Sequence, residues 1–232
     1  MGGAISLSTL SADYTAQDGE ILTGTLGAHV KISIADGAKV TLRDAAINGV
    51  NDYKFVERGP LLLIESDYPW AGLTCEGNAT IFLEGTNSVR GFYQDYPGIY
   101  VPPERTLTIT GDGELTASSN GFEDDFFGGQ AAGIGGGPFR DCGNIVIEGG
   151  TITATGGYYG AGIGSGFQVE GGFFGRCGDI TIKDTVTKVK ATRGEKAQHS
   201  IGAGCCGRCG TVTIGDDVGS RSEPTCTYPP NK

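Results

Sequence analysis

The chain has 232 residues, of which 42 are glycine, and its formal net charge at pH 7 is −10. Glycine at more than twice its usual share of about 7%, without a strict three-residue period, argues against long amphipathic helices and excludes a collagen-like triple helix. The acidic balance argues against nucleic acid as a partner, because basic contacts to phosphates supply most of that affinity. No apolar run reaches the roughly 18 residues that a membrane-spanning helix needs, so we expect no membrane insertion.

Short β segments recur along the chain in a constant order. The first are expected at residues 30–34, 39–42, 79–85 and 106–111. Clearer copies follow, each with a Gly-Ile-Gly-like segment, then a Cys-Gly segment that continues with alternating apolar residues, then a third alternating segment. Their residues are 132–136, 142–147 and 151–156, then 161–165, 177–182 and 189–194, then 200–203 and 209–214. Such self-similarity indicates a repeat architecture.

Each segment alternates apolar and polar residues, which is typical of a β-strand with one buried face. Ile145 and Ile147 fall on one side of their segment, whereas Asn144 and Val146 fall on the other. Such short segments suit a coil that turns three corners and stacks on the next coil at the strand spacing of about 4.8 Å. The pattern therefore predicts a parallel β-helix.

Glycine recurs at the expected corners of the coil. Gly143, Gly178 and Gly210 share one repeat position, and Gly156 and Gly194 share another. A sharp turn often requires a positive φ, which glycine adopts without a steric penalty. We expect these glycines to serve that purpose.

The seven cysteines form an odd set, so at least one thiol is unpaired within the chain. Cys142, Cys177 and Cys209 occupy the same repeat position, which predicts an inward column of thiols. Thiols pack well in such columns, but stacking rarely gives the side-chain geometry of a disulfide. We therefore expect these three to be reduced.

Aromatic residues gather in glycine-rich insertions between the β segments. The insertions lie at residues 92–96, 121–128, 138–141 and 167–174, with a tyrosine pair at 158–159. Insertions on one side of a solenoid often form its binding face, and flat rings suit the apolar face of a sugar. The alternative is that these rings fold back and pack as small loop cores. The aromatic candidates for ligand binding are Trp70, Phe126, Phe127, Tyr158, Tyr159, Phe173 and Phe174.

Two charged motifs complete the candidates. Arg176 and Arg208 each precede a repeat cysteine, so their side chains should point outward on adjacent coils. They could bind carboxylate sugars bidentately, or pair with neighbouring acids such as Asp179. The acids Asp124 and Asp125 lie in a loop and are either a solvated loop tip or ligands of a calcium ion. No other cofactor is expected.

The repeat resembles one found in large secreted or wall-attached bacterial proteins. The resemblance rests on the string from Ala132 to Gly136 followed by the string from Cys142 to Ile152, and on residues 96–102 leading into 107–111. It implies a right-handed parallel β-helix of pectin-lyase-like shape, described in that family as a carbohydrate-binding domain. It carries no catalytic residues, and it implies an extracellular or cell-surface location.

We therefore predict an all-β chain that forms a single right-handed parallel β-helix of about six coils with loop insertions. Residues 1–20 and 215–232 are expected to form its caps, and residues 21–214 its coils. The preferred function is non-catalytic binding of a polysaccharide or surface glycan. One alternative is a structural stalk or an adhesin module that binds a protein. A polysaccharide lyase or hydrolase is less favoured, because the aspartate pair lacks the Gly-His-Gly segment of the β-helix hydrolases.

Overall fold

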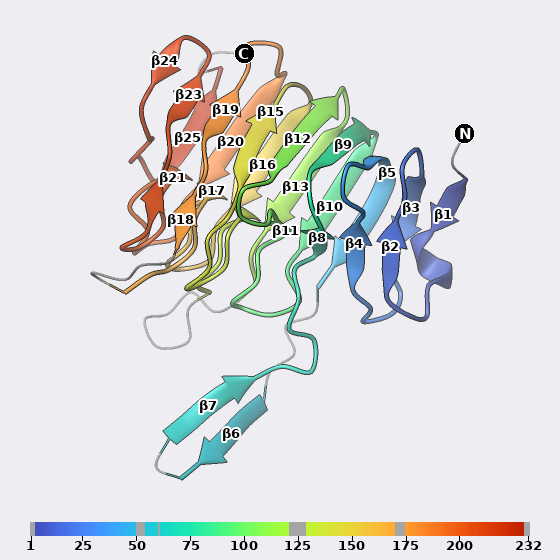
Figure 1. Ribbon diagram of the computed structural model, residues 1–232, viewed down its shortest axis with the longest axis horizontal. Helices are drawn as coiled ribbons and strands as arrows, with labels where there is room; N and C mark the ends of the chain where they lie inside the picture. Colours follow the sequence, from blue (N-terminus) through green and yellow to red (C-terminus); the bar gives the residue numbers. More distant parts are fainter. Residues whose placement is uncertain (1–2, 50–53, 60, 121–128, 170–174, 230–232) are drawn as a thin grey trace.

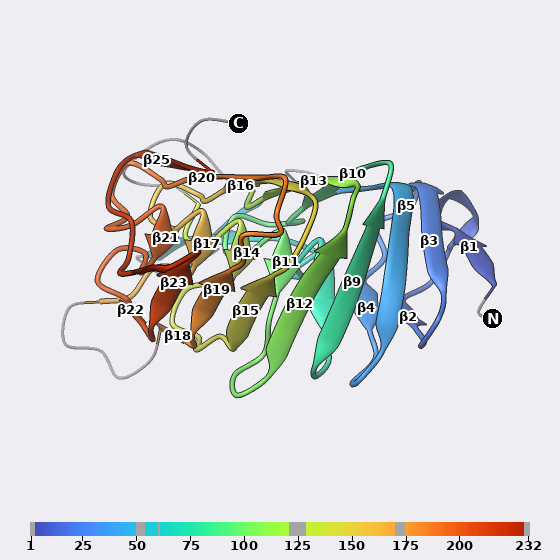
Figure 2. The same ribbon diagram turned by 90° about the horizontal axis from the view of Figure 1, so that it is seen from above.

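The chain winds into a parallel β-helix with three walls (Figures 1 and 2). The structure is a computed structural model that describes residues 3–49, 54–59, 61–120, 129–169 and 175–229. Successive coils place their strands side by side in parallel register, as the sequence predicts. Within the described residues the chain is almost entirely β, with one short 3-10 helix, η1 (Leu7–Thr9).

The first two walls belong to one sheet because β5 (Lys39–Asn48) passes through both. Residues 39–43 of β5 pair with β9 in the first wall, and residues 46–48 pair with β10 in the second. The remaining strands of the first wall are β1 (Ala4–Ser6), β3 (Ile21–Thr25), β9 (Ala79–Glu84), β12 (Thr106–Gly111), β15 (Asn144–Ile147), β19 (Ile180–Ile182), β23 (Val212–Ile214) and β24 (Asp217–Val218). Those of the second wall are β10 (Thr86–Arg90), β13 (Glu114–Ser118), β16 (Thr151–Thr155), β20 (Lys188–Thr192) and β25 (Thr225–Tyr228).

The third wall is a sheet of seven short strands among the described residues. They are β2 (Tyr14–Ala16), β4 (Ile32–Ile34), β8 (Leu73–Cys75), β11 (Ile99–Tyr100), β14 (Ile134–Gly135), β17 (Ile163–Gly164) and β21 (Ile201–Gly202). A two-stranded sheet of β18 (Arg176–Cys177) and β22 (Arg208–Cys209) lies at the corner between the third and first walls. A hairpin of β6 (Lys54–Arg58) and β7 (Leu61–Glu65) projects from the coils (Figure 1). At the C-terminal end, β24 and β25 pair antiparallel with β23 and β20.

The core consists of columns of aliphatic side chains that repeat from coil to coil. One column in the first wall runs through in-register partners: Val40, Ile81, Ile109, Ile147, Ile182 and Ile214. Every one of them is at most 2% exposed. The alternation that predicted the strands therefore also sets which side chains fill the interior, because neighbouring residues of a strand point to opposite faces.

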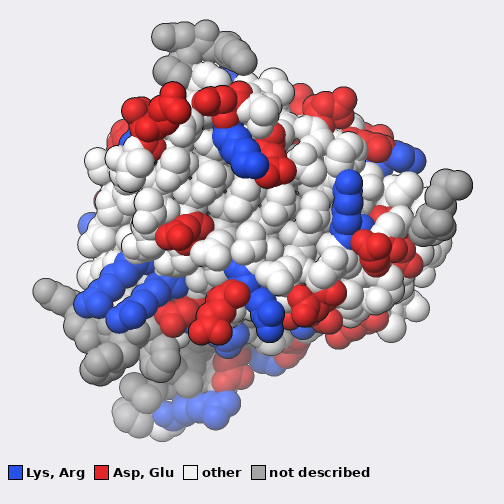
Figure 3. Space-filling view, turned by 45° about the horizontal axis from the view of Figure 1, so that its top comes forward, with Lys and Arg blue, Asp and Glu red and all other residues white. Residues whose placement is uncertain are grey.

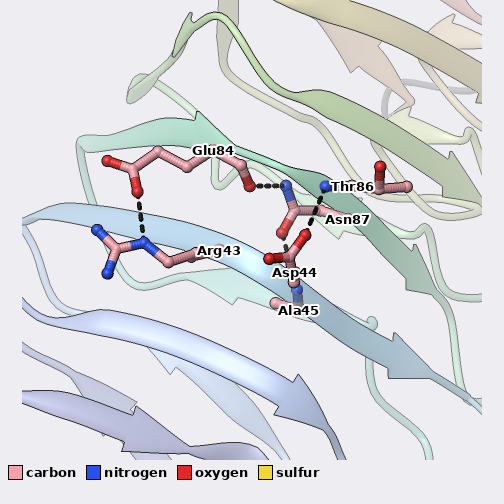
Figure 4. A network of polar contacts seen from close by, with 6 residues as sticks. All are labelled: Arg43, Asp44, Ala45, Glu84, Thr86 and Asn87. Atoms are coloured by element: carbon pink, nitrogen blue, oxygen red, sulfur yellow. Dashed lines mark hydrogen bonds and ion pairs between the residues drawn. The ribbon is translucent and has the colours of Figure 1, made fainter.

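Polar side chains close the corner between the first and second walls (Figure 4). Asn87 is 1% exposed, and its amide donates to the carbonyls of Glu84 and Glu114 at 3.0 and 3.1 Å. Its Oδ1 accepts from the Ala45 amide at 2.9 Å. Asp44, with φ of 49°, accepts from the Thr86 amide at 3.0 Å. These bonds satisfy backbone groups where the strands turn, so the bend does not leave buried polar groups unpaired.

A ladder of Asn and Asp side chains lines the corner before the first wall. In each step the carboxyl or amide oxygen of one coil accepts a backbone N–H of the next coil. Asn144 Oδ1 accepts from the Asp179 amide at 2.8 Å, and Asp179 Oδ1 accepts from the Thr211 amide at 2.7 Å. Asp36 Oδ1 accepts from the Asn78 amide in the same way, at 2.8 Å. The ladder extends the pairing between coils beyond the ends of the strands.

The corner glycines lie close to atoms of neighbouring segments, and the expectation that they adopt a positive φ is wrong. None of Gly143, Gly178 and Gly210 has φ in the left-handed region. A Cβ on Gly178 would lie 2.3 Å from Asn144 Oδ1, and one on Gly210 would lie 2.4 Å from Asp179 Oδ1. The glycines at 156 and 194 likewise lack a positive φ and face backbone atoms. Close approach of the adjacent coil therefore requires glycine here.

Replacing Asp179 by alanine should lower the free energy of unfolding by about 1–2 kcal/mol, because the Thr211 amide loses a charged hydrogen-bond acceptor. Asp179→Asn is the matched control, since it keeps Oδ1 and should lie within about 0.5 kcal/mol of the parent protein. Urea denaturation of the three proteins gives the comparison. Equal losses in the two variants would contradict a role for the oxygen.

The cysteine column is confirmed. Cys177 and Cys209 are in-register partners, and Cys142 and Cys177 are 4% and 5% exposed. The sulfurs of Cys142, Cys177 and Cys209 donate to backbone carbonyls of neighbouring loops at 3.5, 3.6 and 3.5 Å. All seven thiols are free. The column thus fills the corner between the third and first walls with small, weakly polar side chains.

Candidate functional site

A groove lies on the outer side of the third wall, where loops from four coils meet. Its inner part has a volume of about 260 Å³ and is lined by Lys31, Trp70, Thr74, Asp95, Tyr96, Tyr100 and Arg140, among others. Its outer part, of about 510 Å³, shares Pro69, Asp95, Tyr96 and Arg140 with the inner part and extends to Glu65, Tyr93 and Phe139. Because four residues line both, we treat them as one groove, called the loop groove below. Its size suits a ligand of several rings.

The floor of the loop groove comes from the alternation of the third wall. Leu73 and Ile99 are fully buried, so the next residue of each strand, Thr74 and Tyr100, points outward. These two are in-register partners on β8 and β11. A hydroxyl and an aromatic ring therefore lie side by side at the base.

Trp70 forms one side of the groove and is held by other aromatic rings. Its ring centroid is 5.5 Å from that of Tyr68 and 5.8 Å from that of Phe92. The Phe92 amide donates to the Trp70 carbonyl at 3.1 Å, which ties the loop after β7 to the loop after β10. The half-buried indole is thus fixed by packing. Its Nε1 is buried and has no hydrogen-bond partner among the described residues.

Asp95 also lines the loop groove, and one of its carboxylate oxygens is unsatisfied in the described part of the chain. Oδ1 is buried and has no partner in the described part of the chain. Burial raises the pKa of this carboxyl from 3.8 to about 6, although the charge of Arg140 opposes the shift. A buried polar atom without a partner is unfavourable and rare in folded proteins. Trp70 and Asp95 therefore each carry a buried polar atom without a partner among the described residues, and both residues line one pocket.

The loop that carries Asp95 is fixed by hydrogen bonds from the following coil. The Gln130 amide donates to the Gln94 carbonyl at 3.0 Å, and Asn120 Nδ2 donates to the Gly91 carbonyl at 3.0 Å. The Gly72 amide donates to the Pro97 carbonyl at 3.2 Å on the other side. Asp95 is thus held between two coils, so its carboxyl does not have to be ordered by a ligand.

Two cations line the inner part of the groove. The Arg140 guanidinium lies over the Tyr96 ring, 5.7 Å from its centroid, and Lys31 lines the pocket from the coil of β4. Neither forms an ion pair within the described residues, whereas several other cations of the chain do, such as Arg58 with Glu65 at 2.8 Å. The face of the molecule drawn in Figure 3 carries charges of both signs, mostly at its periphery, without a continuous patch of either. The loop groove is therefore distinguished by two cations that line it and have no ion-pair partner among the described residues.

Tyr158 and Tyr159 lie away from the loop groove. Tyr158 is 8% exposed, and its ring meets that of Tyr159 edge-on at 5.0 Å. Tyr159 contacts Phe167 at 5.1 Å, and Phe167 contacts Phe139 at 5.4 Å. Tyr158 also lines a separate hollow of about 320 Å³ with Thr155, Thr192 and Glu195. The aromatic row thus leads from this hollow toward Phe139 at the outer part of the groove.

Arg176 and Arg208 occupy adjacent coils, as their repeat position predicts. They are in-register partners on β18 and β22, and both side chains are exposed. Within the described ranges neither forms an ion pair, with Asp179 or with another acid. Asp179 serves the backbone ladder instead. The pair is a second, shallower candidate for binding an anion.

The remaining candidates lie outside the described residues. They are Phe126, Phe127, Phe173, Phe174, Asp124 and Asp125. Elsewhere in the described chain, no cluster of three or more His, Cys, Asp or Glu side chains could hold a metal ion. None of the described helices is long and apolar enough to span a membrane.

Of the predicted site residues that the structure describes, only Trp70 lies in the loop groove. Asp95, Tyr96, Tyr100 and Arg140 were not among the predicted ligand-binding residues. The sequence nevertheless contained an indication of three of them, because Asp95 and Tyr96 fall in the insertion at 92–96 and Arg140 falls in the insertion at 138–141. Both insertions carry aromatic and charged residues together, and such loops frequently supply binding residues.

Comparison with known proteins supports the fold. A family model described as a β-helix repeat matches residues 107–138 and 145–167. These segments correspond to β12–β14 and β15–β17, so each match begins in the first wall and ends just beyond the third. No curated protein and no solved structure matches the chain. The sequence match and the observed pairing agree on a parallel β-helix built from repeats.

Proposed function

We propose that the loop groove binds a carbohydrate and that the protein is a non-catalytic glycan-binding module at the cell surface. One observation carries the proposal: Trp70 Nε1 and Asp95 Oδ1 are both buried without a partner, and both residues line the same pocket. A sugar hydroxyl can accept from the indole N–H and donate to the carboxyl. The extracellular location rests on the family resemblance alone.

The other lining residues support a sugar rather than a purely apolar ligand. The rings of Trp70, Tyr96 and Tyr100 offer flat surfaces for the C–H faces of pyranose rings, while Thr74 offers a hydroxyl at the floor. The site is also preorganised, because the loops on both sides are held by bonds to adjacent coils. A preorganised site loses less entropy on binding.

Replacing Trp70 should weaken glycan binding strongly. Trp70→Phe keeps a ring but removes the N–H, and it should weaken binding by roughly tenfold, which corresponds to the loss of one hydrogen bond of about 1.4 kcal/mol. Trp70→Ala also removes the platform and should weaken binding further. Affinity electrophoresis against a panel of soluble polysaccharides, followed by calorimetry on the best ligand, measures both effects.

Tyr159→Ala is the control, since it removes an aromatic ring outside the loop groove. Binding that survives Trp70→Ala but not Tyr159→Ala would move the site to the tyrosine pair. The absence of binding to any glycan would contradict the proposal and favour a structural stalk or a protein-binding adhesin. Each variant is compared with the parent protein by thermal unfolding, so that lost binding is not confused with lost structure.

One observation favours a second candidate, catalysis on a glycan. A carboxyl with a pKa of about 6 in a cleft is suited to general acid catalysis, and Glu65, paired with Arg58, lines the outer part of the same groove. Glycoside hydrolysis usually requires two carboxylates on either side of the scissile bond. Release of reducing ends or of unsaturated products, abolished in Asp95→Asn, would replace the binding proposal with this one.

A further inference from the structure

We infer that the carbohydrate taken by the loop groove is acidic, carrying a carboxylate or sulfate group that Lys31 and Arg140 bind. The inference rests on the proposed function and names the chemical class of its ligand. It follows from the charges that line the inner part of the groove.

The first step concerns the pairing of the two cations. The chain has 27 acidic and 17 basic residues, so acids are in excess. In the described part of the chain Lys31 and Arg140 nevertheless lie without a carboxylate within ion-pair distance, although both line one small pocket. Two cations that converge on a cavity and lack internal partners favour an external anion, since each can form a charge-assisted hydrogen bond to it.

The second step excludes the nearby acids as internal partners. Asp141, next to Arg140, directs its Oδ1 to the backbone amide of Arg176 at 2.9 Å. Glu65, in the outer part of the groove, pairs with Arg58 at 2.8 Å. Asp95 lowers the net positive charge of the pocket when it is ionised, but it does not contact Arg140 closely enough to form an ion pair. The positive charges therefore remain available.

The third step concerns the chemistry of Arg140. Its guanidinium lies over the Tyr96 ring, 5.7 Å from the ring centroid, within the range of a cation–π contact. A guanidinium can bind a carboxylate or sulfate with two parallel hydrogen bonds. Trp70 and Asp95 lie in the lining of the same pocket and would bind a hydroxyl of the same sugar. One acidic sugar could thus use all four groups.

The test compares each acidic polymer with its own neutral derivative. The probes are a polyglucuronate and its carboxyl-reduced form, and a sulfated galactan and its desulfated form. We expect at least tenfold tighter binding to one acidic member than to its neutral partner. We also expect that preference to shrink between 10 and 300 mM NaCl, because added salt screens the charges. Whichever pair shows the preference identifies the anionic group.

Variants then assign the preference to the two cations. Lys31→Gln and Arg140→Gln should each reduce affinity for the acidic polymer several-fold, and together they should abolish the preference for the acidic polymer over its neutral partner. Lys190→Gln is the matched control, since it removes an exposed positive charge from β20 on the second wall. It should leave the preference unchanged.

The outcomes separate this inference from the proposed function. Equal binding of acidic and neutral polymers would overturn the inference and leave the glycan-binding function intact. Failure to bind either kind would overturn both. A preference lost in Arg176→Gln but kept in the Lys31 and Arg140 variants would overturn the inference, since it would place the anion at the β18–β22 arginine pair.

Discussion

Replacement of Gly164 by alanine is expected to prevent stable folding, with a loss of roughly 4 kcal/mol or more in the free energy of unfolding. Gly164 lies in the third wall with φ of 138°, and a Cβ there would lie 1.8 Å from the Gly202 carbonyl oxygen of the next coil. The backbone cannot move away cheaply, because β17 is paired with β14 on one side and β21 on the other. Gly135 meets Gly164 in the same way, at 2.0 Å.

Gly37→Ala separates the steric effect from the backbone effect. Gly37 also has a positive φ, of 78°, but no atom lies within 4 Å of the position of its Cβ. Its replacement should therefore cost only the conformational penalty of about 1–2 kcal/mol. Urea denaturation and far-ultraviolet circular dichroism of the two variants provide the comparison. Similar losses at the two sites would show that contact between coils at Gly164 is not the cause.

The fold could be predicted because its determinants repeat within the sequence. The alternation around Ile145 and Ile147 specifies a strand and its buried face, and the shared position of Cys142, Cys177 and Cys209 specifies how coils stack. The purpose of Gly178 could not be predicted in the same way. Its neighbour in space is Asn144 on the previous coil, and whether glycine there relieves backbone strain or a side-chain clash depends on the separation of the coils.

The loop groove was less predictable, for a related reason. Apart from Thr74 and Tyr100, which are in register on β8 and β11, its residues come mainly from loops of unequal length, on which the repeat imposes no register. Trp70 is one of the predicted ligand-binding residues, but its position in the groove depends on contacts such as the bond from the Phe92 amide to the Trp70 carbonyl. Arg140 reaches the groove from the loop after β14, on yet another coil. Periodicity places strands, whereas the loops between them are placed by individual contacts.

Replacing Asp95 by asparagine is expected to change the free energy of unfolding, relative to the parent protein, more favourably at pH 8 than at pH 4. The folded state raises the pKa of Asp95 from 3.8 to about 6, so the folded state holds a proton that the unfolded chain has released between these values. The stability contributed by this proton is fully present below pH 3.8 and is lost as the pH rises through 6. A shift of this size corresponds to about 2–3 kcal/mol once partial solvent screening is allowed for.

The measured quantity is the difference in free energy of unfolding between Asp95→Asn and the parent protein, taken from urea denaturation at several pH values. The difference should become more favourable to the variant by about 2–3 kcal/mol from pH 4 to pH 8. Effects of the new amide that do not depend on pH cancel in this comparison. Asp112→Asn, which removes an exposed carboxylate at a corner, is the control for the loss of one negative charge.

A carboxyl in a cleft whose pKa is raised by burial is a candidate functional group. If Asp95 accepts a ligand hydroxyl, a bound glycan supplies the partner that Oδ1 lacks and should reduce the penalty. The pH-dependent difference between Asp95→Asn and the parent protein should then shrink when the glycan is present at saturation. An unchanged difference would mean that the ligand does not reach Asp95, and the loop groove would lose its central acceptor.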